Sequence, residues 1–115
     1  MSSTPNVFPV ANDVCVAGQL APAAMASLAE SGFKSVINNR PDFEGGPDQP
    51  TNAAIEAAAR EAGLAYAFLP VASAMQTPEE IARFAQLLET MPRPILAFCR
   101  SGTRSANLYR AAIGG

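Results

Sequence analysis

The stretch Pro94–Tyr109, with the sequence PILAFCRSGTRSANLY, decides the architecture of this chain. Its first part, Ile95–Phe98, is an apolar run of the length expected for one buried strand. A single cysteine, Cys99, follows, then a short polar loop with one glycine, and then a segment whose apolar spacing predicts a helix. Such a strand, loop and helix N-terminus form an anion-binding nest, because successive backbone N–H groups and the positive end of the helix dipole face one point.

Cys99 is the candidate nucleophile of this nest, since a thiolate is an anion that the nest stabilises. Arg104 is predicted to grip an oxyanion or sulfur oxide with two N–H groups, and its charge is expected to lower the thiolate pKa. An inert core thiol is the alternative, but the charged and polar loop that follows would be costly to bury without an anion. The side chain of Arg100 is as compatible with solvent as with recognition. The predicted cradle consists of Arg100, Ser101, Gly102, Thr103 and Ser105.

Strands and helices are predicted to alternate along the chain. Apolar runs predict strands at 7–10, 14–17, 33–38, 64–71 and 95–98, and apolar spacing predicts helices at 22–31, 51–62, 77–90 and after Gly102. This order indicates an α/β three-layer sandwich with a mainly parallel central sheet flanked by helices. Ligands bind such sheets beyond the carboxyl ends of the strands, which is where Cys99 falls.

A long polar loop runs from Asn38 to Pro50, which is unusual in a small domain and favours a functional role. It also leaves the carboxyl end of a predicted strand, so it can reach the same edge of the sheet as Cys99. Asn39, Arg40 and Asp42 are therefore candidates for the mouth of the site. The alternative is that Asn-Arg-Pro-Asp serves only as turn chemistry.

Composition excludes several classes of function. The 115 residues predict one domain spanning 1–115, and a net charge of −2 gives no reason to expect nucleic acid or an anionic membrane as a partner. The N-terminus lacks the features of a signal peptide and no apolar run could span a membrane, so a cytoplasmic location is expected. The absence of histidine removes Cys–His catalysis and histidine-based zinc sites, and no metal or cofactor is expected. Cys15, between two valines, is predicted to be a buried structural thiol.

The sequence Cys99-Arg-Ser-Gly-Thr-Arg104-Ser resembles the active loop of rhodanese-type sulfurtransferases. Protein tyrosine and dual-specificity phosphatases carry a longer loop, with a histidine before the cysteine and five residues between cysteine and arginine. Here Phe98 replaces the histidine and only four residues intervene. The resemblance implies a smaller cradle, suited to a persulfide rather than to a phosphate.

Motifs along nearly the whole chain resemble a bacterial family, the phosphatase-like domain of the beta-lactamase-hydrolase-like proteins (DUF442). The resemblance implies a dual-specificity-phosphatase-like fold and a family labelled both phosphatase and sulfurtransferase. It also implies that the chain is either the N-terminal module of a fusion with a persulfide dioxygenase or flavoprotein, or a small stand-alone member with such a partner. The motifs are 17–20 (AGQL), Gly32-Phe33, 36–42 (VINNRPD), 62–66 (AGLAY) and 69–71 (LPV).

Sulfur transfer is the function that the sequence favours. A phosphatase needs a general acid for its leaving group, yet residues 71–76 (VASAMQ) contain no carboxylate, so Asp42 or Asp48 would have to substitute. Sulfur transfer needs less acid assistance, because its leaving group is a good one. The expected substrates are a small sulfane-sulfur donor and a thiol acceptor. The alternatives are a phosphatase that acts on a phosphoester and a non-catalytic redox or anion sensor.

Overall fold

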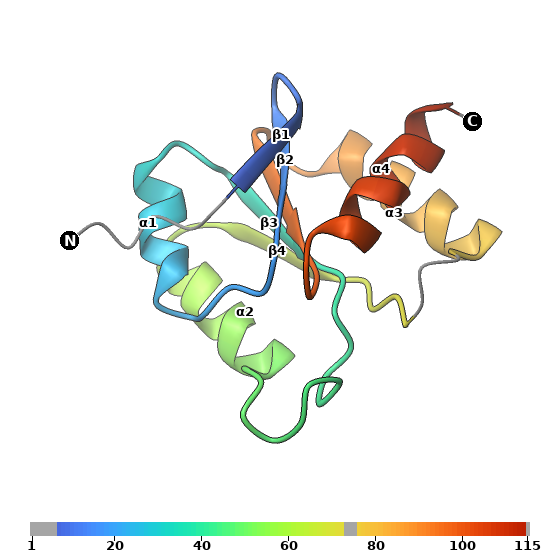
Figure 1. Cartoon of the computed structure of the whole chain (residues 1–115). Coiled ribbons are helices and arrows are strands. Elements are labelled where there is room, and N and C mark those ends of the chain that lie inside the picture. Colours follow the sequence, from blue (N-terminus) through green and yellow to red (C-terminus); the bar gives the residue numbers. More distant parts are fainter. Residues whose placement is uncertain (1–6, 73–75, 115) are drawn as a thin grey trace.

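The structure of the protein is a computed structural model that describes residues 7–72 and 76–114. Figure 1 shows a central sheet between two pairs of helices. The elements are β1 (Val7–Ala11), β2 (Val14–Ala17), α1 (Ala24–Glu30), β3 (Ser35–Asn38), α2 (Asn52–Glu61), β4 (Ala65–Phe68), α3 (Pro78–Thr90), β5 (Ile95–Phe98) and α4 (Thr103–Gly114).

The strands form one sheet in the order β1-β2-β5-β3-β4. The hairpin partners β1 and β2 are antiparallel, whereas β2, β5, β3 and β4 are all parallel to their neighbours. The cysteine strand β5 is therefore central, between β2 and β3. The predicted mainly parallel sheet is confirmed, and the carboxyl ends of three adjacent strands meet where β5 ends.

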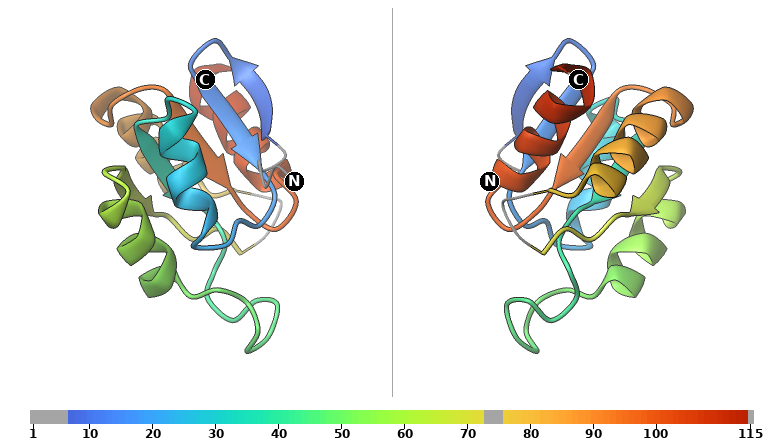
Figure 2. Two further views of the ribbon diagram at one scale, coloured as in Figure 1. Left: turned by 90° about the vertical axis from the view of Figure 1, so that its left-hand side faces the viewer. Right: turned by 90° about the vertical axis from the view of Figure 1, so that its right-hand side faces the viewer.

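Alternate residues of β5 are buried on opposite faces of the sheet. Leu96 and Phe98 pack into a cluster with side chains of α1 and α2, and Ile95 and Ala97 pack into another with side chains of α3 and α4. All four are fully buried, which explains why this strand is a continuous apolar run rather than an alternating one. Figure 2 shows α1 and α2 over one face and α3 and α4 over the other, so the predicted three-layer sandwich is confirmed.

The element boundaries follow local signals, with differences at several ends, among them β3, which begins at Ser35 rather than at Phe33. The strand predicted at 64–71 ends at Phe68, although the amides of Leu69 and Val71 still donate to the carbonyls of Asn38 and Asn39, both at 2.9 Å. The first helix begins at Ala24 rather than at Pro22. The predicted start at Thr77 is confirmed as a capping box, in which the Thr77 and Glu80 side chains accept from each other's backbone amides.

The long loop after β3 leaves the body of the sheet and returns to α2 (Figure 1). It is organised by the side chain of Gln49, which is only 8% exposed and accepts from the Gly45 amide at 2.7 Å while donating to the Pro41 carbonyl at 2.9 Å. This pair of bonds closes the turn that carries Glu44. Of the helices in the described ranges, none is long and apolar enough to cross a membrane.

Candidate active site

The loop after β5 lies among the carboxyl ends of its neighbours. The Cys99 amide donates to the Ala17 carbonyl at the end of β2, at 3.2 Å, and the Phe98 carbonyl accepts from the Asn39 amide beyond β3, at 2.8 Å. Cys99 thus sits between the segment that follows β2 and the long loop that follows β3. The sheet order brings the predicted nucleophile and part of the predicted mouth together.

Gly102 allows the loop to curl back on Cys99. Its φ of +94° lies in the left-handed region, and its amide donates to the Cys99 Sγ at 3.1 Å. A Cβ at this position would also come within 3.4 Å of the Ala17 backbone. Glycine is therefore required by the conformation of the loop, because the contact of a Cβ with Ala17 would be an ordinary van der Waals contact.

The sulfur of Cys99 is held as the predicted nest requires. The residue has no exposed surface, and burial alone would raise the pKa of its thiol. Hydrogen bonds from the backbone of Ser105, Ser101 and Gly102 outweigh burial and hold the pKa of Cys99 below its ordinary value. The thiolate therefore depends mainly on backbone dipoles, as in a nest at a helix N-terminus.

Ser105 ties the cradle to the loop after β3. Its buried hydroxyl donates to Asn39 Oδ1 at 2.8 Å, and the Asn39 side-chain amide in turn donates to the Leu69 carbonyl at 2.9 Å. Asn39 is completely buried, so these bonds satisfy its polar atoms and fix the two loops relative to each other. Asn39 is therefore a structural link between the cysteine loop and the loop after β3.

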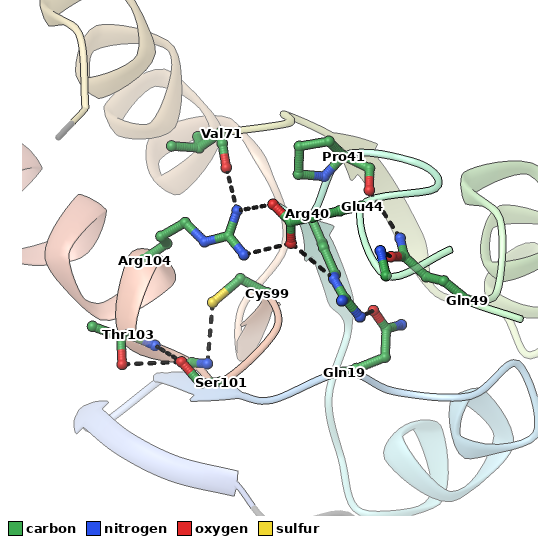
Figure 3. Close-up of polar contacts among 12 residues, drawn as sticks. Gln19, Arg40, Pro41, Glu44, Gln49, Val71, Cys99, Ser101, Thr103 and Arg104 are labelled. Carbon is green, nitrogen blue, oxygen red and sulfur yellow. Dashed lines mark hydrogen bonds and ion pairs between the residues drawn. The ribbon is translucent and has the colours of Figure 1, made fainter. Parts of the chain in front are cut away.

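The guanidinium group of Arg104 is bonded to other groups of the protein. Its guanidinium grips the Glu44 carboxylate with two bonds, at 2.8 and 2.7 Å, and donates to the Val71 carbonyl at 2.6 Å (Figure 3). Hydrogen bonding to Glu44, against some burial, raises the pKa of Arg104, and the Cys99 thiolate adds to this increase. The expectation that the Arg104 charge chiefly serves the thiolate is therefore incomplete, since Glu44 shares that charge.

Arg40 approaches the same carboxylate from another side. Its Nε lies 3.0 Å from Glu44 Oε1, and its NH1 donates to Gln19 Oε1 at 3.0 Å. Hydrogen bonding to Arg104 leads the causes that lower the pKa of Glu44 to about 2, with Arg40 adding to it and burial opposing it. Glu44 is therefore ionised, and Figure 3 shows both guanidinium groups converging on it.

Asp42 lies outside this cluster. Its Oδ1 accepts from the Asn52 amide at 2.6 Å, so it serves the N-terminus of α2. Asp42 thus has a structural role at the start of α2, and its place in the mouth stays a prediction. Gly45 follows Glu44 without a side chain, and a Cβ there would come within 2.6 Å of the Arg40 guanidinium.

The remaining predicted residues divide into two groups. Arg100, Ser101 and Thr103 are exposed, and the last two side chains bond to each other at 3.1 Å, so they contribute backbone rather than side chains to the cradle. Cys15 is a half-buried free thiol whose pKa is raised by burial. It pairs in register with Leu96, three residues before Cys99, which places the two sulfurs roughly 10 Å apart along the strands and beyond disulfide reach.

A cavity of about 320 Å³ lies between β1 and the cysteine loop, and Ser101, Gly102 and Thr103 are among its lining residues. A largely apolar cavity of about 750 Å³ lies between α3 and α4, lined by residues such as Ile81 and Ala112, away from the cradle. Among the described residues, no three histidine, cysteine, aspartate or glutamate side chains gather closely enough to hold a metal ion. The chemistry of the site is that of one thiolate, two guanidinium groups and one carboxylate.

This fold and this cradle define a class, the cysteine-loop domains with the architecture of protein tyrosine phosphatases. Residues 7–114 match the family described as beta-lactamase hydrolase-like protein, phosphatase-like domain. The chain belongs to that family, which confirms the prediction made from its motifs. The chain is therefore a phosphatase-like domain.

Three proteins illustrate the likeness. A beta-lactamase hydrolase-like protein of Xylella fastidiosa is 42% identical over 96 residues, which are 84% of this chain and 22% of the relative, so the chain spans about a fifth of that protein. A "putative phosphatase" of Neisseria meningitidis superposes with a TM-score of 0.81 at 31% identity, over 89% of this chain and 72% of the other. Tk-PTP shares the fold, with a TM-score of 0.66 at 15% identity over 84% and 62% of the two chains.

Glu44 was not predicted from the sequence, and neither were Gln19 and the Val71 carbonyl as partners of the arginines. Glu44 is one of three carboxylates on the long loop, with Asp42 and Asp48, and nothing in the local pattern distinguishes them. The one available signal is the spacing of Arg40 and Glu44, which are four residues apart. That spacing has meaning in a helix, and this segment is a loop.

Proposed function

We propose that the domain is a cysteine-dependent sulfurtransferase in which Cys99 carries sulfane sulfur as a persulfide. The observation that carries the proposal is the pairing of Glu44 with Arg104. The carboxylate beside the cradle has a pKa of about 2 and is ionised at neutral pH, so it cannot protonate a leaving group. Asp42 is engaged at α2, and residues 71–76 contain no carboxylate. Within residues 7–72 and 76–114, the groups bonded to Cys99 and Arg104 are thus a nucleophile's oxyanion donors and an ionised carboxylate, and none of them is a protonated acid.

Sulfur transfer fits these groups step by step. The Cys99 thiolate attacks the outer sulfur of thiosulfate, the sulfur–sulfur bond of the donor breaks, and its electron pair leaves with sulfite. Cys99 then carries a persulfide anion, which the backbone N–H groups of Ser101, Gly102 and Ser105 are placed to stabilise as they stabilise the thiolate. A cyanide or thiolate acceptor takes the outer sulfur and returns Cys99 to the thiolate. No proton transfer is needed.

Phosphate-ester hydrolysis is the second candidate, and the comparisons favour it over sulfur transfer. The family description names a phosphatase-like domain, and the 31%-identical structure from Neisseria meningitidis carries the words "putative phosphatase". In this mechanism Cys99 attacks phosphorus and Arg104 binds the equatorial oxygens after Glu44 leaves. The leaving alkoxide would then have to take its proton from water.

The deciding experiment measures both chemistries on one preparation. The intact mass of the protein is recorded after incubation with thiosulfate or glutathione persulfide, beside an assay with p-nitrophenyl phosphate. A gain of one sulfur atom that is absent in Cys99→Ala and discharged by cyanide supports sulfur transfer. Saturable phosphate release without a sulfur adduct would instead establish the phosphatase, and the absence of both would leave the anion or redox sensor.

Arg104→Ala separates the two chemistries further. A phosphoryl transition state depends on the guanidinium for its developing charge, whereas a persulfide depends chiefly on the backbone amides. With glutathione persulfide as the donor, whose leaving group is a thiolate and not an oxyanion, the variant should therefore lose far more phosphatase activity than sulfur-transfer activity. Equal losses in the two assays would contradict this assignment of the cradle.

A further inference from the structure

Two guanidinium groups and one carboxylate form a closed cluster beside the nucleophile. The side chains of Arg40 and Arg104 are only 9% and 13% exposed, and Glu44 bonds to both. In the described residues, no buried side-chain nitrogen or oxygen lacks a hydrogen-bond partner. The Glu44 carboxylate therefore acts as an internal ligand for two arginines that would otherwise be buried without an anion.

The charges of this cluster match a dianion only when Glu44 is away from the arginines. Arg40 and Arg104 contribute two positive charges, which a dianion balances by itself. With Glu44 still in place, the negative charges would rise to three against two positive ones in a partly buried site, which is unfavourable. An anionic substrate must therefore displace Glu44.

We infer that Arg40 and Arg104 together form an anion subsite and that Glu44 is a specificity-determining residue which occupies it at rest. The inference rests on the proposed function and deepens it. The substrate class is a sulfane-sulfur donor whose leaving group is an oxyanion, as in thiosulfate. The sulfonate oxygens take the place of the Glu44 carboxylate. The outer sulfur then faces Cys99, because the side chains of Cys99 and Glu44 both interact with Arg104.

The turn that carries Glu44 is built to hold this carboxylate. Gln49 closes the turn from inside, and the absence of a side chain at Gly45 gives Arg40 its close approach. The adjacent Phe43 is 64% exposed and has a φ of +63°, which is strained for a bulky residue.

Inorganic sulfate is the probe that tests the subsite without any catalysis. Its affinity is measured by calorimetry and by its effect on the rate at which iodoacetamide alkylates Cys99 in a Cys15→Ser background. Glu44→Gln should bind sulfate at least tenfold more tightly than the parent, because the competing charge is removed while the size of the side chain is kept. Asp48→Asn, which removes an exposed charge from the same loop, is the matched control and should leave the affinity unchanged.

A second substitution shows whether both arginines take part. Adding Arg40→Gln to the Glu44→Gln protein should weaken sulfate binding at least tenfold. The same series should show a lower KM for thiosulfate in Glu44→Gln, with a smaller change in kcat. The inference would be overturned if the parent and Glu44→Gln bound sulfate equally well, or if adding Arg40→Gln left the sulfate affinity of Glu44→Gln unchanged.

The outcomes for the subsite and for the proposed function can be told apart. Tighter sulfate binding by Glu44→Gln in a protein that never takes up sulfur would support the subsite and refute sulfur transfer. Sulfur uptake on Cys99 with unchanged sulfate affinity would support sulfur transfer and refute the subsite.

Discussion

The Glu44 carboxylate gives the stability of the protein a specific dependence on pH. Its pKa falls from the ordinary 4.5 to about 2 on folding, and one pKa unit corresponds to 1.36 kcal/mol, so the full effect would be about 3 kcal/mol. The side chain is 25% exposed at the edge of the protein, and solvent screening reduces the expected contribution to about 1 to 2 kcal/mol. Glu44→Gln should lower the free energy of unfolding by that amount at pH 7.

The difference between the two proteins should disappear in acid. Because the folded-state pKa of Glu44 is lower than its unfolded-state value, the stabilisation is complete above pH 4.5 and is lost as the pH falls toward 2. The measurement is urea-induced unfolding of both proteins between pH 2 and pH 7, in buffers without sulfate or phosphate, which would occupy the arginines. The two curves of stability against pH should converge at the acid end.

A control distinguishes the partly buried ion pairs of Glu44 from an ordinary surface ion pair. Glu56 pairs with Arg60 on the exposed side of α2, with side chains 38% and 61% exposed, and Glu56→Gln should cost no more than about 0.5 kcal/mol. If Glu44→Gln behaves like Glu56→Gln at pH 7, or if its curve runs parallel to that of the parent down to pH 2, the Glu44 cluster is not formed in solution. The argument for an internally occupied subsite would then fail.

Three further predictions concern the cradle. Gly102→Ala forces an L-residue to φ +94° and should destabilise the protein by about 1 to 2 kcal/mol and reduce alkylation of Cys99, as measured by urea unfolding and intact mass. The titration of each thiol is measured as the ultraviolet thiolate absorbance of the parent minus that of Cys99→Ser or of Cys15→Ser. The pKa of Cys99 should lie below the ordinary thiol value and the pKa of Cys15 above it; the reverse order would contradict the nest. Ser105→Ala should cost about 1 to 3 kcal/mol, because Asn39 loses its buried partner, and should keep the pKa of Cys99 low, because the backbone amide of residue 105 is retained; a pKa at the ordinary thiol value would contradict the role of the amides.

The elements of the fold were predictable because their signals are local. Ile95–Phe98 is apolar at every position since both faces of β5 are covered, and Thr77 with Glu80 is a capping box within four residues. The curl of the cysteine loop is equally local, because Gly102 and the start of α4 follow Cys99 directly. Local chain geometry is enough to predict a strand, a nest and a nucleophile.

The state of the site was decided by tertiary structure. Arg104 meets Glu44 across 60 residues and Ser105 meets Asn39 across 66, and both contacts exist because β3 and β5 are neighbours in the sheet. The sequence alone determined that this protein places a cysteine and an arginine in an anion nest. Only the fold determined which of three loop carboxylates reaches that arginine, because a loop of this length can bring any of them to the same edge and the closure by Gln49 selects Glu44.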